Sequence, residues 1–280
     1  MFRLALAIFL AAIPASTAAP KLQLPYDVEL DPAGRIFVAD GGRHQLLRWD
    51  ARRRQLIVRK SGLGEPTCLA FDRRGNVYFS DVANGVVRRL SPSGTLSTVA
   101  RLSRAAGVSV DPAGRYLAIA SFTRGIVRVE LASGRAETIA AIGDNGLTTP
   151  HGVAYAANGD LWIADTGAGA YRLRSGGPLE LVARVPAFRV VPLAGGGAYL
   201  ISGRPSGGRV DRLAPDGTLT RVAGTGRLAR HADGIPARRA GILPSDVAPL
   251  PGGRLLLTQT APVPALRVID RSGRISTVTR

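Results

Sequence analysis

The sequence predicts an all-β protein, a six-bladed β-propeller in which each blade is a four-stranded antiparallel sheet. Two observations support this fold class. A unit that begins near a proline and reaches a turn glycine nine residues later occurs six times in the 280 residues, and the repeated region lacks the 3.6-residue hydrophobic period of helices. Radial packing of blades protects most of the sheet edges that such repeats create, so a propeller fits the pattern best.

The six copies can be aligned without gaps over their first ten residues. They occupy residues 25–34, 66–75, 105–114, 150–159, 187–196 and 244–253. Their turn glycines are separated by 41, 39, 45, 37 and 57 residues. This spacing suits units of four short strands with insertions in the connecting loops.

Each unit contains the signals of its strands in order. In the first copy, residues 26–30 form the first strand, and Pro32 and Gly34 supply a turn. Residues 36–39 form a second strand whose continuous apolar character is typical of strands buried on both faces. Third strands are expected at 46–49, 126–129 and 268–269, and fourth strands at 95–99, 218–222 and 274–278.

The two ends of the repeated region leave ring closure open. The region starts on an inner strand at Tyr26 and ends on an outer strand at Thr277. Closure then depends on face packing between the first and last blades. Alternatively, residues 21–24 add a strand to blade six.

The N-terminus has the plan of a secretory signal peptide. A basic start is followed by an apolar stretch of residues 4–13, Pro14 and several small residues. This stretch is shorter than the roughly 20 residues of a membrane span. We therefore expect a signal peptide over residues 1–18, one propeller domain over 19–280, no stable membrane span after cleavage, and a secreted or periplasmic protein.

Charge and cysteine content limit the partners and the chemistry. The net charge of +17 makes a polyanion one candidate partner, although the dispersed basic residues favour a solvated surface. Six arginines are expected in one register of the third strands, in a scaffold role: Arg48, Arg89, Arg128, Arg172, Arg212 and Arg267. Cys68 is the only cysteine, which excludes an internal disulfide and favours a small buried residue over a nucleophile.

The repeat resembles that of the NHL-repeat family over nearly the whole chain after residue 18. Residues 150–154 (PHGVA) lead to residues 159–165 (GDLWIAD), and residues 222–248 look like the long inter-blade loop of bacterial NHL proteins. The resemblance implies a bacterial, secreted six-bladed propeller, related in fold to gluconolactonase-like and streptogramin lyase-like propellers. It implies little about chemistry, because such propellers include binding proteins, lactonases, lyases and scaffolds.

Two positions in each blade are expected to surround one mouth of the channel, where ligand sites usually form. We call the second residues of the six copies the mouth ring: Tyr26, Thr67, Ala106, His151, Phe188 and Ser245. We call the next residues the inner ring: Asp27, Cys68, Gly107, Gly152, Arg189 and Asp246. The residue types differ from blade to blade, which suits a non-symmetric ligand and equally suits a channel under relaxed constraint.

His151 is the candidate catalytic residue, because histidine titrates near neutral pH. The alternative is a structural role in which it hydrogen-bonds the loop of a neighbouring blade. The candidate ligand-binding residues are Tyr26, Asp27, Thr67, Phe188, Arg189 and Asp246.

Two further features receive structural interpretations. The residues at the ends of the second strands are expected to accept hydrogen bonds from the following turn: Asp40, Asp81, Ser121, Asp165, Ser202 and Gln259. The loop over residues 227–239 either covers one face as a flap or packs flat.

The function favoured by the sequence is an extracytoplasmic, monomeric binding module that holds an unknown small molecule or protein through its channel-mouth loops. The alternative is a metal-dependent lactonase of the gluconolactonase-like class. The resemblance to that class implies a divalent cation held by carboxylates and an asparagine. Asp27 and Asp246 would then bind Ca²⁺ or Mg²⁺. The glutamate-glycine opening and paired-aspartate motif of that class are absent from the sequence.

Overall fold

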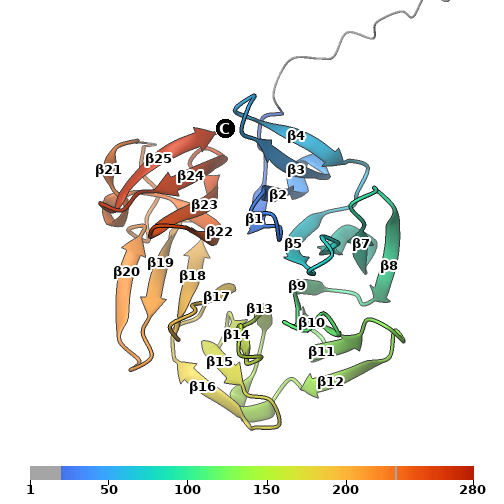
Figure 1. Cartoon of the computed structure of the whole chain (residues 1–280). Coiled ribbons are helices and arrows are strands. Elements are labelled where there is room, and N and C mark those ends of the chain that lie inside the picture. Colours follow the sequence, from blue (N-terminus) through green and yellow to red (C-terminus); the bar gives the residue numbers. More distant parts are fainter. Residues whose placement is uncertain (1–19, 231) are drawn as a thin grey trace, which may run out of the picture.

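The computed structural model describes residues 20–230 and 232–280, and these form a six-bladed β-propeller (Figure 1). Every blade contains four antiparallel strands that follow one another in sequence from the channel outward, which confirms the predicted fold class. Among the described residues, no helix is long and apolar enough to cross a bilayer.

The first three blades are built from the following strands: β1 (Pro25–Leu30), β2 (Ile36–Asp40), β3 (Gln45–Asp50) and β4 (Gln55–Lys60); β5 (Pro66–Phe71), β6 (Val77–Asp81), β7 (Val86–Leu90) and β8 (Leu96–Arg101); β9 (Ala105–Val110), β10 (Tyr116–Ser121), β11 (Gly125–Glu130) and β12 (Ala136–Ala140). The last three blades are built from β13 (Pro150–Tyr155), β14 (Leu161–Asp165), β15 (Ala170–Leu173) and β16 (Leu179–Ala183); β17 (Arg189–Pro192), β18 (Ala198–Arg204), β19 (Gly207–Leu213) and β20 (Leu219–Ala223); β22 (Leu243–Leu250), β23 (Arg254–Ala261), β24 (Ala265–Ile269) and β25 (Arg274–Thr279).

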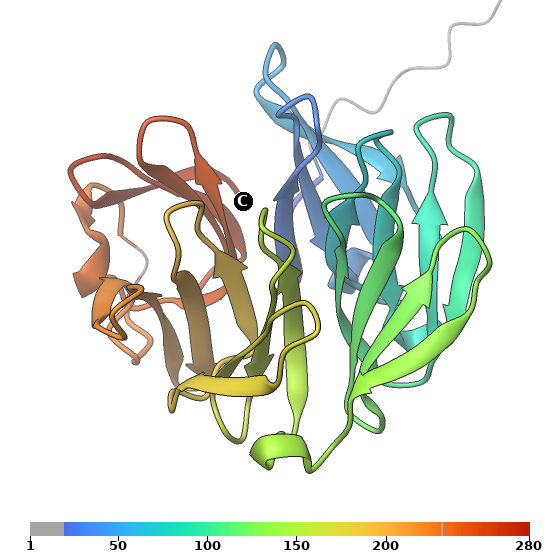
Figure 2. The same ribbon diagram turned by 60° about the horizontal axis from the view of Figure 1, so that its bottom comes forward.

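The loops that enter the innermost strands gather at one end of the molecule. In Figure 2 this is the lower end, where the short helical turn η3 (Asp144–Gly146) precedes β13. The tight turns between first and second strands lie at the opposite end. Ligand-accessible loops from all blades therefore converge on a single mouth.

Carboxylates at the ends of second strands fix these entry loops. The Asp40 carboxylate accepts hydrogen bonds from the amides of Gln23 and Leu24, both at 2.9 Å, and from the Arg43 amide at 3.3 Å. In the same way, Asp165 accepts from Thr149 at 2.6 Å. The predicted bonds to the following turn are present at Asp40, and the carboxylate additionally ties down the loop that precedes the first strand.

A β-bulge lies near the start of the first strand in five of the described blades. In blade one, Pro25 is opposite Asp40 and Asp27 is opposite Ala39, so Tyr26 is the extra residue. His151 is the extra residue of blade four for the same reason. A bulge bends the strand and redirects side chains. Because of the bulge, a mouth-ring residue and the inner-ring residue that follows it can both lie toward the channel.

The prediction of one register for the six arginines is wrong for Arg267. Each of the other five pairs with the residue three positions before the predicted end of its second strand, as Arg48 pairs with Phe37, three positions before Asp40. Arg267 pairs with Leu257, only two positions before Gln259, so it faces the opposite side of its sheet. It is 1% exposed and donates to the Gln259 side chain at 2.9 Å and to Asp233 at 2.8 Å.

The described part of the 227–239 loop packs flat. Its strand β21 (Ile235–Pro236) pairs with β25 as a fifth strand at the outer edge of blade six. The Ala237 amide donates to the Gly273 carbonyl at 2.8 Å. The structure thus selects the second of the two alternatives for this loop.

Ring closure relies on packing between the faces of blades one and six. Residues 21–24 add no strand to blade six, whose described sheet is β21-β25-β24-β23-β22. Instead, Leu22 and Val28 share a buried apolar cluster with Leu256 and Leu266. The expected signal peptide, residues 1–18, lies outside the described residues.

We predict that Leu22→Ala weakens ring closure. Leu22 is 6% exposed within the cluster that joins the first and last blades. Its truncation should lower the free energy of unfolding by about 2–4 kcal/mol, because a buried leucine loses apolar contacts and leaves a cavity. Leu24→Ala is the matched control, since Leu24 is 37% exposed, and should change stability by about 0.5 kcal/mol or less. Urea denaturation measures both, and equal effects would contradict closure by this cluster.

Candidate functional site

A cavity of about 530 Å³ opens at the channel mouth. Side chains from all six blades line it. They include the complete mouth ring: Tyr26, Thr67, Ala106, His151, Phe188 and Ser245. Its volume lies in the range of small-molecule sites. The structure therefore brings together, around one space, the residues that occupy equivalent positions in the sequence repeat.

Aromatic rings form one wall of the cavity. The His151 ring lies 5.3 Å from the ring of Phe122 and 5.8 Å from that of Phe188, measured between centroids. Burial lowers the pKa of His151 to about 4, and the positive charge of Arg189 acts in the same direction. His151 is consequently neutral at neutral pH and a weak base.

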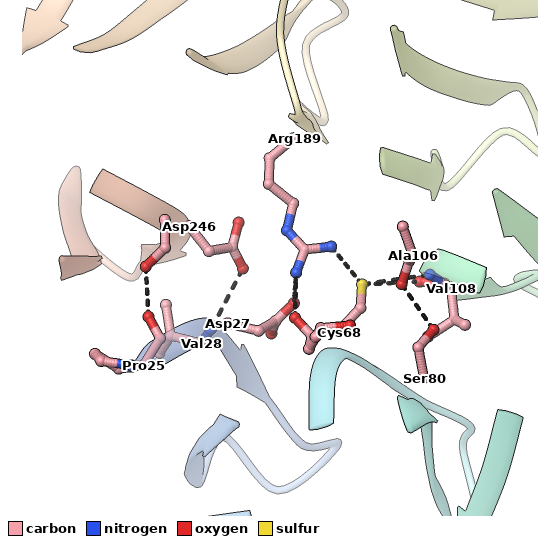
Figure 3. A network of polar contacts seen from close by, with 11 residues as sticks. Pro25, Asp27, Val28, Cys68, Ser80, Ala106, Val108, Arg189 and Asp246 are labelled. Carbon is pink, nitrogen blue, oxygen red and sulfur yellow. Dashed lines mark hydrogen bonds and ion pairs between the residues drawn. The ribbon is translucent and has the colours of Figure 1, made fainter. Parts of the chain in front are cut away.

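Arg189 lines the cavity, and its side chain spans the channel toward Asp27 and Cys68 (Figure 3). Its side chain starts in blade five and reaches blades one and two. Nη2 lies 2.9 Å from the Asp27 carboxylate and donates to the Thr67 carbonyl at 2.5 Å, while Nη1 donates to Cys68 Sγ at 2.5 Å. Asp27 is 3% exposed and Arg189 is 7% exposed, so this ion pair is buried.

Two more carboxyl groups lie close to this ion pair. Asp246 accepts a hydrogen bond from the Val28 amide at 3.3 Å (Figure 3), and burial together with the Asp27 charge raises its pKa well above the usual range. Burial raises the pKa of Glu29 to about 8, and the charge of Asp27 contributes. Burial raises the pKa of Asp27 as well, and the charge of Arg189 opposes this rise. Asp27 is the carboxyl group that pairs directly with Arg189. We call Asp27, Glu29, Cys68, Arg189 and Asp246 the channel plug.

The inner-ring glycines are explained by close backbone packing. A Cβ atom on Gly107 would lie 2.8 Å from the His151 carbonyl oxygen, and one on Gly152 would lie 2.7 Å from the Phe188 carbonyl oxygen. No side chain fits at either position without a backbone shift. Close packing thus explains why blades three and four have glycine in the inner ring, where the other blades have a residue with a side chain.

Cys68 is held as a buried thiol. It is 3% exposed, and its sulfur accepts a hydrogen bond from the Val108 amide at 3.3 Å. Burial raises its pKa to about 12 despite the nearby guanidinium of Arg189. Because the thiolate is the reactive form, this environment does not suit a nucleophile.

The channel carboxylates do not fit a divalent cation. Asp27 already pairs with the guanidinium of Arg189, and Asp246 already accepts a hydrogen bond from the Val28 amide. In residues 20–230 and 232–280, no group of three or more His, Cys, Asp or Glu side chains is placed to hold a metal ion. The arrangement provides hydrogen bonds and charge balance where the lactonase alternative requires open coordination positions.

The predicted site residues fall into two sets. Tyr26, Thr67, Phe188 and Arg189 line the cavity with His151, whereas Asp27 and Asp246 lie in the plug and do not line it.

Sequence reasoning missed Phe122 and Glu29. Phe122 directly follows the second strand of blade three, and the repeat gave no signal for it. Glu29 is two residues after Asp27, and period-two alternation could have placed both on one side of the strand.

One family model matches part of the chain, the SMP-30/gluconolactonase/LRE-like region, over residues 63–184. These residues include all strands of blades two, three and four. None of the curated proteins matches the chain. The match supports the predicted relation to gluconolactonase-like propellers, and the NHL assignment stays a prediction.

Solved structures share the fold over most of their length. An auxiliary nutrient binding protein from Bacteroides thetaiotaomicron has a TM-score of 0.73 at 11% identity, with 89% of this chain and 69% of that chain covered. A putative gluconolactonase has a TM-score of 0.66 at 18% identity, with 95% and 94% covered. Virginiamycin B lyase from Staphylococcus aureus has a TM-score of 0.64 at 13% identity, with 91% and 83% covered. At these identities the similarity shows the fold alone.

We predict that Arg189→Met destabilises the protein by about 3–5 kcal/mol, because it leaves a carboxylate buried without its partner. Adding Asp27→Asn removes that orphan charge, so the double variant should lose less than the sum of the two single variants. A double-mutant cycle by urea denaturation measures this coupling. Arg128→Met is the control, since Arg128 pairs with the half-exposed Glu137, and should cost about 1 kcal/mol or less. An equal cost for both arginines would contradict a plug held by Arg189.

We predict that stability falls as pH rises from about 6.5 to about 8. Folded Glu29 keeps its proton up to about pH 8, whereas its ordinary pKa is 4.5, so the folded state binds more protons. His151 acts in the opposite direction at the lower end of this window, because its ordinary pKa of 6.5 leaves it partly protonated in the unfolded state, whereas folded His151 has a pKa of about 4 and is neutral. Because Glu29→Gln has no such proton to lose, its loss of unfolding free energy across this window should be smaller by on the order of 1 kcal/mol. Denaturation midpoints across the window measure it, with exposed Glu137→Gln as the control. A slope unchanged in Glu29→Gln would refute the assignment.

Proposed function

We propose that the protein is an extracytoplasmic, monomeric propeller that binds a small molecule in the cavity at its channel mouth. The observation that carries this proposal is the cavity itself: six blades contribute the mouth ring to its wall, and Arg189, held by Asp27, also lines it. A concave space of this volume removes much of a small ligand from water.

The side chains around the cavity support binding over catalysis. His151 has a pKa of about 4 and Cys68 of about 12, so neither exchanges a proton readily at neutral pH. Glu29, with a pKa of about 8, is not among the residues that line the cavity. Glu65 also lines the cavity and is hydrogen-bonded by Tyr26, and burial raises the pKa of this phenol further above neutral pH.

The lactonase alternative is favoured by the family match over residues 63–184. Its difficulty is the plug, in which Arg189 occupies the carboxylate that would bind the metal ion. The polyanion alternative rests on the net charge of +17. The basic residues are dispersed along the sequence and do not form one block. We therefore place small-molecule binding ahead of both.

Filling the cavity tests this function. A small-molecule library that includes sugar lactones and aromatic alcohols is screened by thermal shift, and hits are quantified by calorimetry. We expect Ala106→Phe and Leu243→Trp to weaken binding of a hit at least tenfold, because both residues line the cavity. Ala157→Phe, at the exposed turn between β13 and β14, should leave binding unchanged. Circular dichroism verifies that each variant is folded.

The same preparations are assayed for lactone hydrolysis with and without Ca²⁺ or Mg²⁺. No metal-stimulated turnover is expected. Hydrolysis that depends on the added metal and is lost in Asp27→Asn would replace the binding function with the lactonase alternative. Hits whose affinity is insensitive to both filling variants would show that the cavity is not the binding site.

A further inference from the structure

We propose that the part of the ligand buried in this cavity is an uncharged planar ring. This inference rests on the proposed function and specifies its ligand class. It follows from three properties of the site: the composition of its wall, the engagement of Arg189, and the position of its polar atoms.

The wall offers ring surfaces from separate blades. Phe122 comes from the loop after β10, His151 from β13 and Phe188 from the loop before β17, and their rings meet at tilted and edge-on angles of 54° and 66°. Tyr26 adds a ring from blade one, and the remaining wall includes Leu243. Aromatic groups prefer offset or edge-on contacts, so this wall favours another planar ring over a flexible polar ligand.

The inner end of the cavity disfavours a charge on the buried end of the ligand. The guanidinium of Arg189 already donates to Cys68 and Thr67 and pairs with Asp27. A ligand carboxylate would have to break this pair or lie near the Asp27 carboxylate. Since His151 is neutral, a buried anion would depend on Arg204, which lines the cavity, or on Arg104, whose guanidinium already lies over the Phe122 ring at 5.6 Å from its centroid. Burying an unpaired charge is costly.

Polar atoms define where a hydrogen-bonding group of the ligand lies. The side-chain oxygen of Thr67 is buried and makes no hydrogen bond within the protein. It can accept one hydrogen bond or donate one, which matches a single hydroxyl or carbonyl on the ring. The side chains of Glu65 and Arg204 are also among the lining residues, and the polar end of a longer ligand would contact them.

The test compares three probes that differ in ring and charge: 2-naphthol, 2-naphthoate and glucono-δ-lactone. Calorimetry at neutral pH should give 2-naphthol an affinity at least tenfold higher than either other probe. Phe122→Ala and Phe188→Ala should each weaken 2-naphthol at least fivefold. His151→Phe should retain 2-naphthol, because it keeps a ring at that position and removes only polar atoms. Leu219→Ala, on outer strand β20 with Leu219 42% exposed, is the control and should change nothing.

The outcomes separate this inference from the proposed function. Tighter binding of 2-naphthoate would refute an uncharged buried end. Binding of glucono-δ-lactone alone, weakened by Ala106→Phe, would refute the ring and leave the cavity as the binding site. Equal loss of 2-naphthol in Leu219→Ala and Phe122→Ala would show that the contact is not in the cavity. Failure of all three probes would refute the ring, and the library screen with the filling variants then decides the proposed function independently.

Discussion

The buried ion pair between Arg189 and Asp27 is the interaction on which the site depends. The ion pair links blade five to blade one. The same guanidinium also donates to Thr67 and Cys68, which links blade five to blade two. Without the cation, the channel would hold several carboxyl groups with no opposite charge nearby. The same arginine lines the cavity at the channel mouth. Packing between the blades and the lining of the cavity therefore depend on one side chain.

The rest of the mouth is arranged by backbone devices that depend on local sequence. Carboxylates such as Asp40 and Asp165 tie each entry loop to the end of the second strand. Bulges at Tyr26 and His151 then redirect side chains toward the channel. Because these contacts are largely to the backbone, they hold the loops in place while leaving the mouth-ring side chains free to differ. This is how a regular scaffold presents an irregular site.

The fold was predictable because the repeat determines it locally. Turn glycines and apolar runs recur at the spacing of a blade, and their alignment places the mouth ring correctly around one space. The register of Arg267 was not predictable, because it depends on strand pairing in blade six and differs by one position from the other blades. The inner ring already grouped Arg189 with Asp27 and Cys68, but the individual contacts were not predictable, since Thr67, for example, lies 122 residues away and meets Arg189 only across the closed ring. Local patterns predict strands, whereas contacts across the channel depend on how blades pack.

A guanidinium and a metal ion both neutralise channel carboxylates, but they differ in what they allow next. A divalent cation keeps coordination positions for water or substrate and can act as a Lewis acid. Arg189 supplies one positive charge with fixed hydrogen-bond directions, and Asp27, Cys68 and Thr67 already use them. In this propeller, whose fold is shared with a putative gluconolactonase, the positive charge next to the channel carboxylate is thus supplied by a side chain of the chain itself.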